Sequence, residues 1–264
     1  MTHLPAARSR LLRIPLGSAG AEAFLAAEPG ADFALHWHEE WSIGAVLEGA
    51  CEFVCDGRRG MAAAGDVVLM PPYALHTAGV ARQGFGMVML YVPHAWVTQR
   101  FGWPPDERAV LCWNTRRDPL AATALAAAVA LPDGDALAGV LDGLLRQACG
   151  EAQVPLRPPA RDARIQGICD MLADAGEAVP PPAALAARLG LSRERFQRLF
   201  RTAVGVTPAH YARLARITQA KRLLGQGCPV ADAAAQCGFA DQAHFSRWFR
   251  RCFGVTPGGY MAAR

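Results

Sequence analysis

The stretch Phe196-Gln-Arg-Leu-Phe-Arg-Thr-Ala-Val-Gly-Val-Thr-Pro-Ala-His-Tyr211 returns 49 positions later as Phe245-Ser-Arg-Trp-Phe-Arg-Arg-Cys-Phe-Gly-Val-Thr-Pro-Gly-Gly-Tyr260. A short alanine-rich segment that ends in glycine precedes each copy, over residues 183–190 and 230–238. A short helix, a turn with glycine and a longer helix that carries arginine predict a helix-turn-helix, the unit that places one helix in a DNA major groove. The repeat therefore predicts two such units in one chain.

The charge of the chain is unevenly distributed. Residues 155–264 hold 16 Lys and Arg against 7 Asp and Glu, a net +9, whereas residues 1–154 hold 11 against 16, a net −5. A basic C-terminal part suits the neutralisation of phosphates. An acidic front part would repel DNA, so we expect it to have another task.

A chain of 264 residues is long enough for about two domains of roughly 100–200 residues each. No unbroken apolar run is long enough to span a membrane, and Met1 is not followed by an apolar signal core. We therefore expect a cytoplasmic protein without a membrane partner. The eight cysteines form no Cys-x-x-Cys pair, and we expect them to be reduced.

The front part shows the pattern of short strands. Strands are expected over residues 33–38, 41–47, 51–55, 67–70 and 84–91, with a two-residue hairpin at Asp56-Gly57. Many short strands separated by glycine and proline are typical of a small antiparallel barrel or sandwich.

A helical hairpin is expected next, over residues 119–130 and up to about residue 148. Its second helix carries an apolar stripe of Leu137, Val140, Leu141, Leu144, Leu145 and Ala148. Two interpretations of this stripe remain open, packing on the barrel and a seam for a homodimer. Three prolines then indicate a linker at residues 151–163, between domains at 1–150 and 164–264.

Residues 165–264 resemble the DNA-binding domain of AraC/XylS-type transcriptional regulators. The resemblance rests on Leu185-Ala-Ala-Arg-Leu-Gly-Leu-Ser, on Gly205-Val-Thr-Pro-x-x-Tyr, on Ala234-Ala-Gln-Cys-Gly-Phe and on the repeated Phe-x-Arg-x-Phe-Arg at Phe196 and Phe245. It implies an all-α domain of seven helices, with two tandem helix-turn-helix units about one DNA turn apart. It also implies promoter or operator DNA as a partner, and RNA polymerase as a further partner if the regulator is an activator.

The front part resembles the cupin sensor domain that is common in this family. The resemblance rests on His36-Trp-His38, Gly49, Gly65-Asp-Val-Val-Leu-Met-Pro71 and His76. It implies an all-β, cupin-like barrel that binds an effector and dimerises. Metal-binding cupins place a glutamate a few residues after the second histidine, where this chain has Ser42 or Ile43.

The exposed face at the start of each recognition helix is expected to contact DNA. Arginine can pair with guanine, glutamine with adenine, and glutamate can accept from cytosine N4. In the two helices, the candidate residues are Arg193, Glu194, Gln197 and Arg198, and then Gln242, Ala243, His244 and Arg247.

Alternation places His36 and His38 on one side of a strand, and the cupin resemblance brings His76 to the same cavity. The three imidazoles could line a pocket for an unknown small effector, together with Trp41, Tyr73 or Trp37. They could instead bind a divalent metal, or be plain structural residues. A cupin enzyme is a further alternative. No Ser/His/Asp set or phosphate loop stands out, so we expect a binding protein that is not an enzyme and needs no cofactor.

Overall fold

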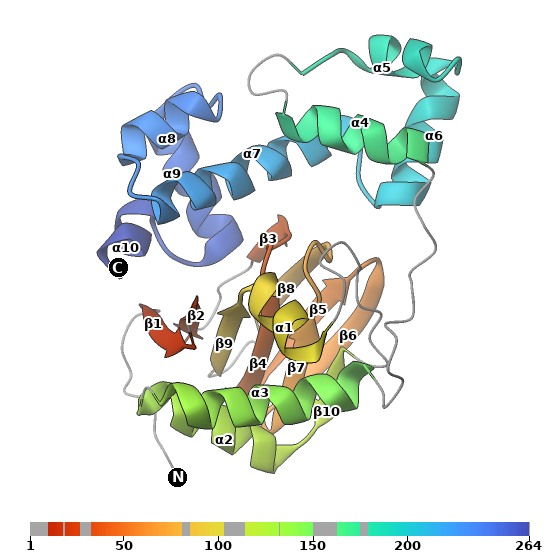
Figure 1. The fold of residues 1–264 in the computed structure, drawn as a ribbon. Coiled ribbons are helices and arrows are strands. Elements are labelled where there is room, and N and C mark those ends of the chain that lie inside the picture. Colours follow the sequence, from red (N-terminus) through yellow and green to blue (C-terminus); the bar gives the residue numbers. More distant parts are fainter. Residues whose placement is uncertain are drawn as a thin grey trace. The chain divides into compact units, whose positions relative to one another are not determined.

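A computed structural model describes residues 10–17, 19–26, 33–80, 85–102, 114–131, 133–149, 163–174 and 179–263. They form two compact units, one made mainly of residues 1–158 and the other mainly of residues 159–250. The first is rich in strands and the second is helical (Figure 1). This confirms the predicted fold class, a cupin-like β domain with a helical hairpin and an all-α domain. Nearly all of the linker expected at 151–163 lies outside the described residues.

Two antiparallel sheets make up the strand-rich unit. The larger sheet has the order β1 (Arg10–Leu16), β2 (Ala19–Ala26), β9 (Gly86–Val92), β4 (Trp41–Glu48), β7 (Asp66–Met70) and β10 (Thr115–Arg117). The smaller sheet has the order β3 (Phe33–His36), β8 (His76–Val80), β5 (Ala50–Cys55) and β6 (Arg58–Ala63). The expected strands are present. The pattern missed β1, β2, β8 and β10, and in β1 a run such as Leu11-Leu12 blurs the alternation.

The hairpin between β5 and β6 turns where the sequence predicts it. Asp56 has φ 46° and Gly57 has φ 79°, and two consecutive positive φ angles are what a type I′ hairpin turn requires. The Asp56 carboxylate also accepts a hydrogen bond of 3.0 Å from the backbone N–H of Leu75. This bond ties the hairpin to the segment that leads into β8.

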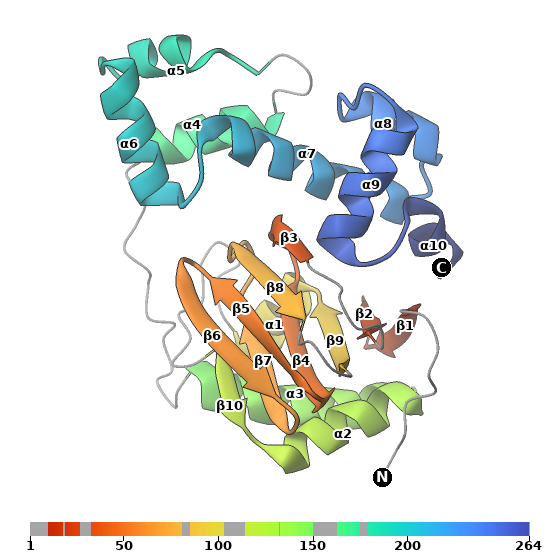
Figure 2. The ribbon, with the colours of Figure 1, turned by 180° about the vertical axis from the view of Figure 1, so that it is seen from behind.

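One face of the larger sheet is covered by the helical hairpin of α2 (Pro119–Ala130) and α3 (Gly134–Cys149) (Figure 2). Alternate residues of β4, β7 and β9 point into the core between the sheet and these helices. The strand residues in this core are Trp41, Ile43, Ala45, Val67, Leu69, Val88, Leu90 and Val92. A further helix that the sequence pattern did not predict, α1 (His94–Phe101), follows β9 and adds Val97 to the same core.

The apolar stripe of α3 belongs to this core. Leu137, Leu141 and Leu145 have no exposed surface, and Leu144 is only 3% exposed. These side chains pack against the sheet and α2. The interpretation of the stripe as a dimer seam is therefore wrong, because a side chain that its own domain has already buried offers no surface to a partner.

Seven helices form the described part of the second unit. They are α4 (Ala163–Asp174), α5 (Pro182–Arg188), α6 (Arg193–Val204), α7 (Pro208–Gly225), α8 (Val230–Gln236), α9 (Gln242–Phe253) and α10 (Pro257–Ala262). The two long arginine-bearing helices, α6 and α9, have 12 residues each. Figures 1 and 2 show α5 and α6 at one end of α7, and α8 and α9 at the other.

The two helix pairs begin and pack alike. The Ser192 hydroxyl accepts from the N–H of Arg195 at 3.2 Å, and the Asp241 carboxylate accepts from the N–H of His244 at 2.6 Å, which satisfies a free N–H at the start of α6 and of α9. Phe196 and Phe200 of α6 are fully buried, as are Phe245 and Phe249 of α9. Within the described residues, no helix is long and apolar enough to cross a membrane.

Candidate functional sites: a nucleic-acid interface and a histidine-lined cavity

The predicted DNA-contacting residues lie on the accessible faces of α6 and α9. Six of the eight are exposed, while Gln197 and His244 are half-buried. His244 is half-buried because its ring packs edge-on against Phe239, with the ring centroids 6.0 Å apart. The exposed residues are Arg193, Glu194, Arg198, Gln242, Ala243 and Arg247.

The arginines of this surface keep their charge available. Ion pairs in the strand-rich unit join Arg13 to Glu22, Arg100 to Asp142 and Arg117 to Asp66. In the part of the chain that the structure describes, Arg198 and Arg247 form no ion pair with a carboxylate. A guanidinium that is not paired with a carboxylate of its own protein can bind a phosphate or a guanine edge through two parallel hydrogen bonds.

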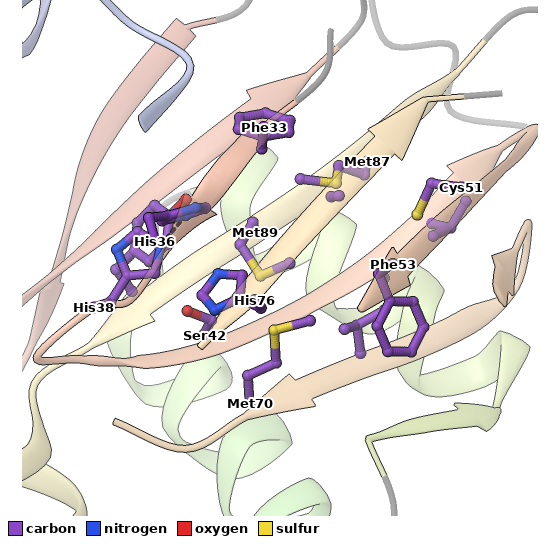
Figure 3. Close-up of a pocket in the computed structure, with 15 residues that line it drawn as sticks. Phe33, His36, His38, Ser42, Cys51, Phe53, Met70, His76, Met87 and Met89 are labelled. Atoms are coloured by element: carbon purple, nitrogen blue, oxygen red, sulfur yellow. Dashed lines mark hydrogen bonds between the residues drawn. The ribbon is translucent and has the colours of Figure 1, made fainter. Parts of the chain in front are cut away.

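A second candidate site is a cavity of about 50 Å³ in the strand-rich unit (Figure 3). It is lined by the faces of β4, β7 and β9 opposite to the helix-covered core, and by residues of β3, β5 and β8. A cavity needs roughly 10–15 Å³ of such space to hold one water molecule. The site therefore has room for an ion or a small ligand.

Three buried histidines meet at this cavity. His36 ends β3, His76 begins β8 opposite to it in register, and His38 follows β3 by two residues. Their exposed fractions are 3–7%, and one ring nitrogen of each lies within 4.8 Å of the other two. The sequence thus correctly predicted that these three side chains converge.

Backbone contacts set the orientation of two of these rings. His36 Nδ1 lies 2.7 Å from the carbonyl oxygen of Ala34, and His76 Nδ1 lies 2.8 Å from that of Ala74. A carbonyl oxygen only accepts, so each Nδ1 carries the proton and donates. In the neutral ring Nε2 then carries the lone pair. His36 Nε2 lies 2.9 Å from His38 Nε2.

Burial favours the neutral form of the histidine on β8. It lowers the pKa of His76 below its ordinary value of 6.5, against the opposing effects of the Ala74 carbonyl and of Asp56. A neutral imidazole is the form that binds a metal or accepts a hydrogen bond from a ligand.

Two residues that were expected to join the histidines lie elsewhere. Trp41 points into the core on the other face of the larger sheet, where its Nε1 donates to His94 Nδ1 at 3.1 Å. Tyr73 is 41% exposed, and its backbone N–H donates to the carbonyl of His38. Neither side chain lines the cavity, and Trp37 does not line it either. The expectation was wrong for Trp41 because adjacent strand residues point to opposite faces, and Trp41 is adjacent to the cavity-lining Ser42.

Sequence reasoning missed a set of sulfur-bearing residues around the cavity. Met70, Met87 and Met89 line it, and so does Cys51. The signal was available, because Met87, Met89 and Tyr91 alternate with the core residues Val88, Leu90 and Val92 along one strand.

The donor set fits the cupin metal site only in part. Three imidazoles converge as such a site requires, and Ser42 lines the cavity near the place where metal-binding cupins have a glutamate. In the described residues, no Asp or Glu lines the cavity. The three histidines could hold an ion, but without the negative charge that a carboxylate would contribute.

Comparisons with known proteins match both parts of the chain to protein families. Residues 18–186 match the family described as "AraC-like ligand binding domain", and residues 185–263 match "Helix-turn-helix domain". A curated relative in Bacillus subtilis (strain 168), "Uncharacterized HTH-type transcriptional regulator YbfI", is 47% identical over 53 residues. That match spans 20% of this chain and 19% of the relative.

Solved structures of ToxT from Vibrio cholerae have a similar fold. The K231A variant of strain SCE256 gives a TM-score of 0.58 at 15% identity, over 94% of this chain and 99% of that one. Wild-type ToxT of the same strain, solved with an unsaturated fatty acid bound, gives 0.57 at 14% identity over 98% and 97%. With a ligand-binding family matched over most of its length and a helix-turn-helix family matched over the rest, this chain belongs to the AraC family of DNA-binding transcription regulators.

Proposed function

We propose that this regulator binds operator DNA through two successive major grooves, one entered by α6 and the other by α9, and that a small effector bound in the N-terminal cavity controls this binding. The observation that carries the proposal is the repeat of α6 and α9, with matching caps and exposed arginines, on either end of α7.

The length of α7 supports the spacing of the two grooves. Its 18 residues span about 27 Å at 1.5 Å per residue. Successive major grooves on one face of DNA are roughly 34–36 Å apart. Arg213, in the first half of α7, stacks on the Trp248 ring of α9 at 5.3 Å from its centroid, and this contact fixes α9 against α7.

Arg198 and Arg247 are proposed as the main base readers, because each is exposed and each stands at the same place in its helix. Arginine pairs with guanine O6 and N7 through two hydrogen bonds. The remaining candidates on the two helices would contact neighbouring bases and phosphates. They are Arg193, Glu194, Gln197, Gln242, Ala243 and His244.

The sensory role of the cavity is supported by its place in the domain matched to a ligand-binding family. ToxT, which has a similar fold, has been solved with an unsaturated fatty acid bound. In this chain, we propose that the effector contacts His36, His38 and His76. A cavity of about 50 Å³ fits a small ligand better than a long chain.

Further partners complete the proposal. We expect the full-length protein to act in the cytoplasm as a homodimer without enzymatic turnover, and to contact RNA polymerase if it activates transcription. Dimerisation would raise the local concentration of the DNA-binding units. Since the α3 stripe is buried, a dimer must use another surface.

The test is a selection of binding sites from randomised duplex DNA by the full chain, followed by footprinting with variants. Arg198→Ala and Arg247→Ala should each weaken binding by about 1–3 kcal/mol and relax specificity in a different half-site. Arg59→Ala, which removes an exposed arginine from β6 of the other domain, is the matched control and should change neither footprint.

Salt dependence gives an independent check. Each neutralised phosphate contributes about −0.9 to the slope of log K against log salt, so the net +9 of residues 155–264 predicts a steep slope. Binding that is insensitive to salt, or footprints of the two variants that weaken at the same base pairs, would show that the two-groove proposal is wrong.

A further inference from the structure

We infer that the cavity of the N-terminal domain is a binding site for monovalent copper, Cu(I), held by His36, His38 and His76 with methionine thioethers as further soft donors. The inference deepens the proposed function, on which it rests for its sensory meaning, since it assigns the chemical class of the effector.

The histidines are arranged to bind an ion. Backbone carbonyls hold the Nδ1–H groups of His36 and His76, so the lone pair of each ring lies on Nε2. Fixing one ring nitrogen through a second-shell hydrogen bond is the usual way in which proteins orient a histidine toward a metal. The three ligand nitrogens lie within 4.8 Å of one another, a separation that one ion with bonds of about 2 Å can bridge after small ring movements.

The charge of the cavity favours an ion with a single positive charge. Its lining, within the described residues, contains no Asp or Glu, and the three imidazoles bring no negative charge when neutral. The free energy needed to charge a buried site grows with the square of the ionic charge. A divalent ion would leave two positive charges in this largely apolar cavity, whereas Cu(I) leaves one.

The methionine thioethers around the cavity also favour Cu(I). Three of the seven methionines of the chain, Met70, Met87 and Met89, line this single small cavity. Figure 3 shows Met70, Met89 and His76 among the side chains that line the cavity. Thioether sulfur is a soft ligand that selects Cu(I), and imidazole binds copper as well.

Glycine at the opposite position makes room for one of these sulfurs. Gly44 pairs with Met89 across β4 and β9, and a Cβ at Gly44 would lie 2.8 Å from the Met89 sulfur. The Met89 thioether therefore lies directly over a position without a side chain. The simpler explanation is that these methionines only fill space, and in that case replacing one by leucine would leave metal affinity unchanged.

The experiment measures metal affinity directly on the full chain after removal of metals by a chelator. Cu(I) is titrated without oxygen against a chromogenic Cu(I) chelator, and Zn(II) and Ni(II) are titrated against chelators of their own. Replacing Cys112, Cys149 and Cys228 by serine limits binding of Cu(I) outside the cavity. Cys228 is only half-buried, and the side chains of the other two are outside the described residues.

One equivalent of Cu(I) is expected, bound more tightly than Zn(II) or Ni(II). His36→Gln should abolish this binding. Met89→Leu should weaken Cu(I) binding at least tenfold while the weaker Zn(II) binding stays unchanged. Met61→Leu, which changes a methionine 63% exposed on β6, is the matched control and should bind Cu(I) as the unaltered chain does.

Tighter binding of Zn(II) or Ni(II), or Cu(I) binding that survives in His36→Gln, would overturn the inference. Unchanged Cu(I) affinity in Met89→Leu would also contradict it, because the methionines would then be space fillers. DNA binding is measured separately with and without Cu(I). If the copper results are as expected and Cu(I) leaves operator affinity unchanged, the copper site stands and the sensory role in the proposed function fails.

Discussion

The two faces of the larger sheet in the N-terminal domain differ in chemistry although the same strands form both. On the face covered by α2 and α3, strands β4, β7 and β9 present mainly aliphatic side chains, such as Ile43, Leu69 and Leu90. On the opposite face, the same strands present Ser42 and three methionines to a cavity with three histidines. The first face is packed and the second leaves space.

Within each of these strands, residues that stabilise the domain therefore alternate with residues that line the cavity. Burial of aliphatic surface stabilises by about 25 cal/mol per Å², so we expect the filled, helix-covered face to stabilise the domain more than the face that borders the cavity. The cavity face gains less from aliphatic burial, because polar side chains and methionines occupy its positions. Variants of each face should therefore have different consequences.

The largest expected effect comes from the helix-covered face. Leu141→Ala removes a side chain with no exposed surface and should lower the free energy of unfolding by about 2–5 kcal/mol. Chemical denaturation that follows the transition of the N-terminal domain measures this loss. Leu120→Ala is the control, because Leu120 of α2 is 85% exposed and should change stability by less than about 0.5 kcal/mol. Equal effects of the two changes would contradict the assignment of the α3 stripe to the core.

The next effect concerns pH and the cavity face. Because burial lowers the pKa of His76, the unfolded chain binds more protons than the folded chain below about pH 6.5. The contribution of neutral His76 to the free energy of unfolding is therefore fully present above this pH, and it is lost as the pH falls toward the lowered pKa of His76. Denaturation of metal-free protein at pH 7 and pH 5 should show this loss, and His76→Gln should reduce it. Leu141→Ala should lower the free energy of unfolding at both pH values but leave the difference between pH 7 and pH 5 unchanged. A smaller difference in Leu141→Ala would mean that the pH dependence is not specific to the cavity face.

Met89→Leu should have a smaller effect on folding. The change nearly conserves volume, so we expect a loss of less than about 1.5 kcal/mol, well below that of Leu141→Ala. Denaturation of both variants under the same conditions measures the difference. A loss as large as that of Leu141→Ala would mean that the cavity face is packed as tightly as the helix-covered face.

The smallest effect is a difference in thiol reactivity. Burial raises the pKa of Cys51 to about 11 and that of Cys55 to about 12. At pH 8 both thiols should stay protonated and react with iodoacetamide far more slowly than the half-buried Cys228. Mass spectrometry of partly alkylated protein measures the order of reaction. Labelling of Cys51 as fast as Cys228 would show that the cavity opens readily to solvent.

Most of the helical domain was predictable from the sequence because its signals are local. Ser192 and Asp241 cap α6 and α9 through hydrogen bonds that span three residues, and the repeat interval of 49 fixes which helices correspond. The hairpin turn at Asp56-Gly57 and the start of α2 at Pro119 are local in the same sense. By contrast, the pattern missed β2, β8, β10 and α1, which depend on pairing or packing with distant segments, and it missed β1, which pairs with β2.

By itself the sequence determined the two-domain fold, the repeated helices with their exposed arginines, and the meeting of His36, His38 and His76. The tertiary structure alone decided that the stripe of α3 packs inward, that Trp41 points away from the histidines, and that Met70, Met87 and Met89 surround them. The physical reason is that periodicity shows which residues share a face of a strand or helix. What that face packs against depends on segments that are distant in the chain, and only the folded structure brings these together.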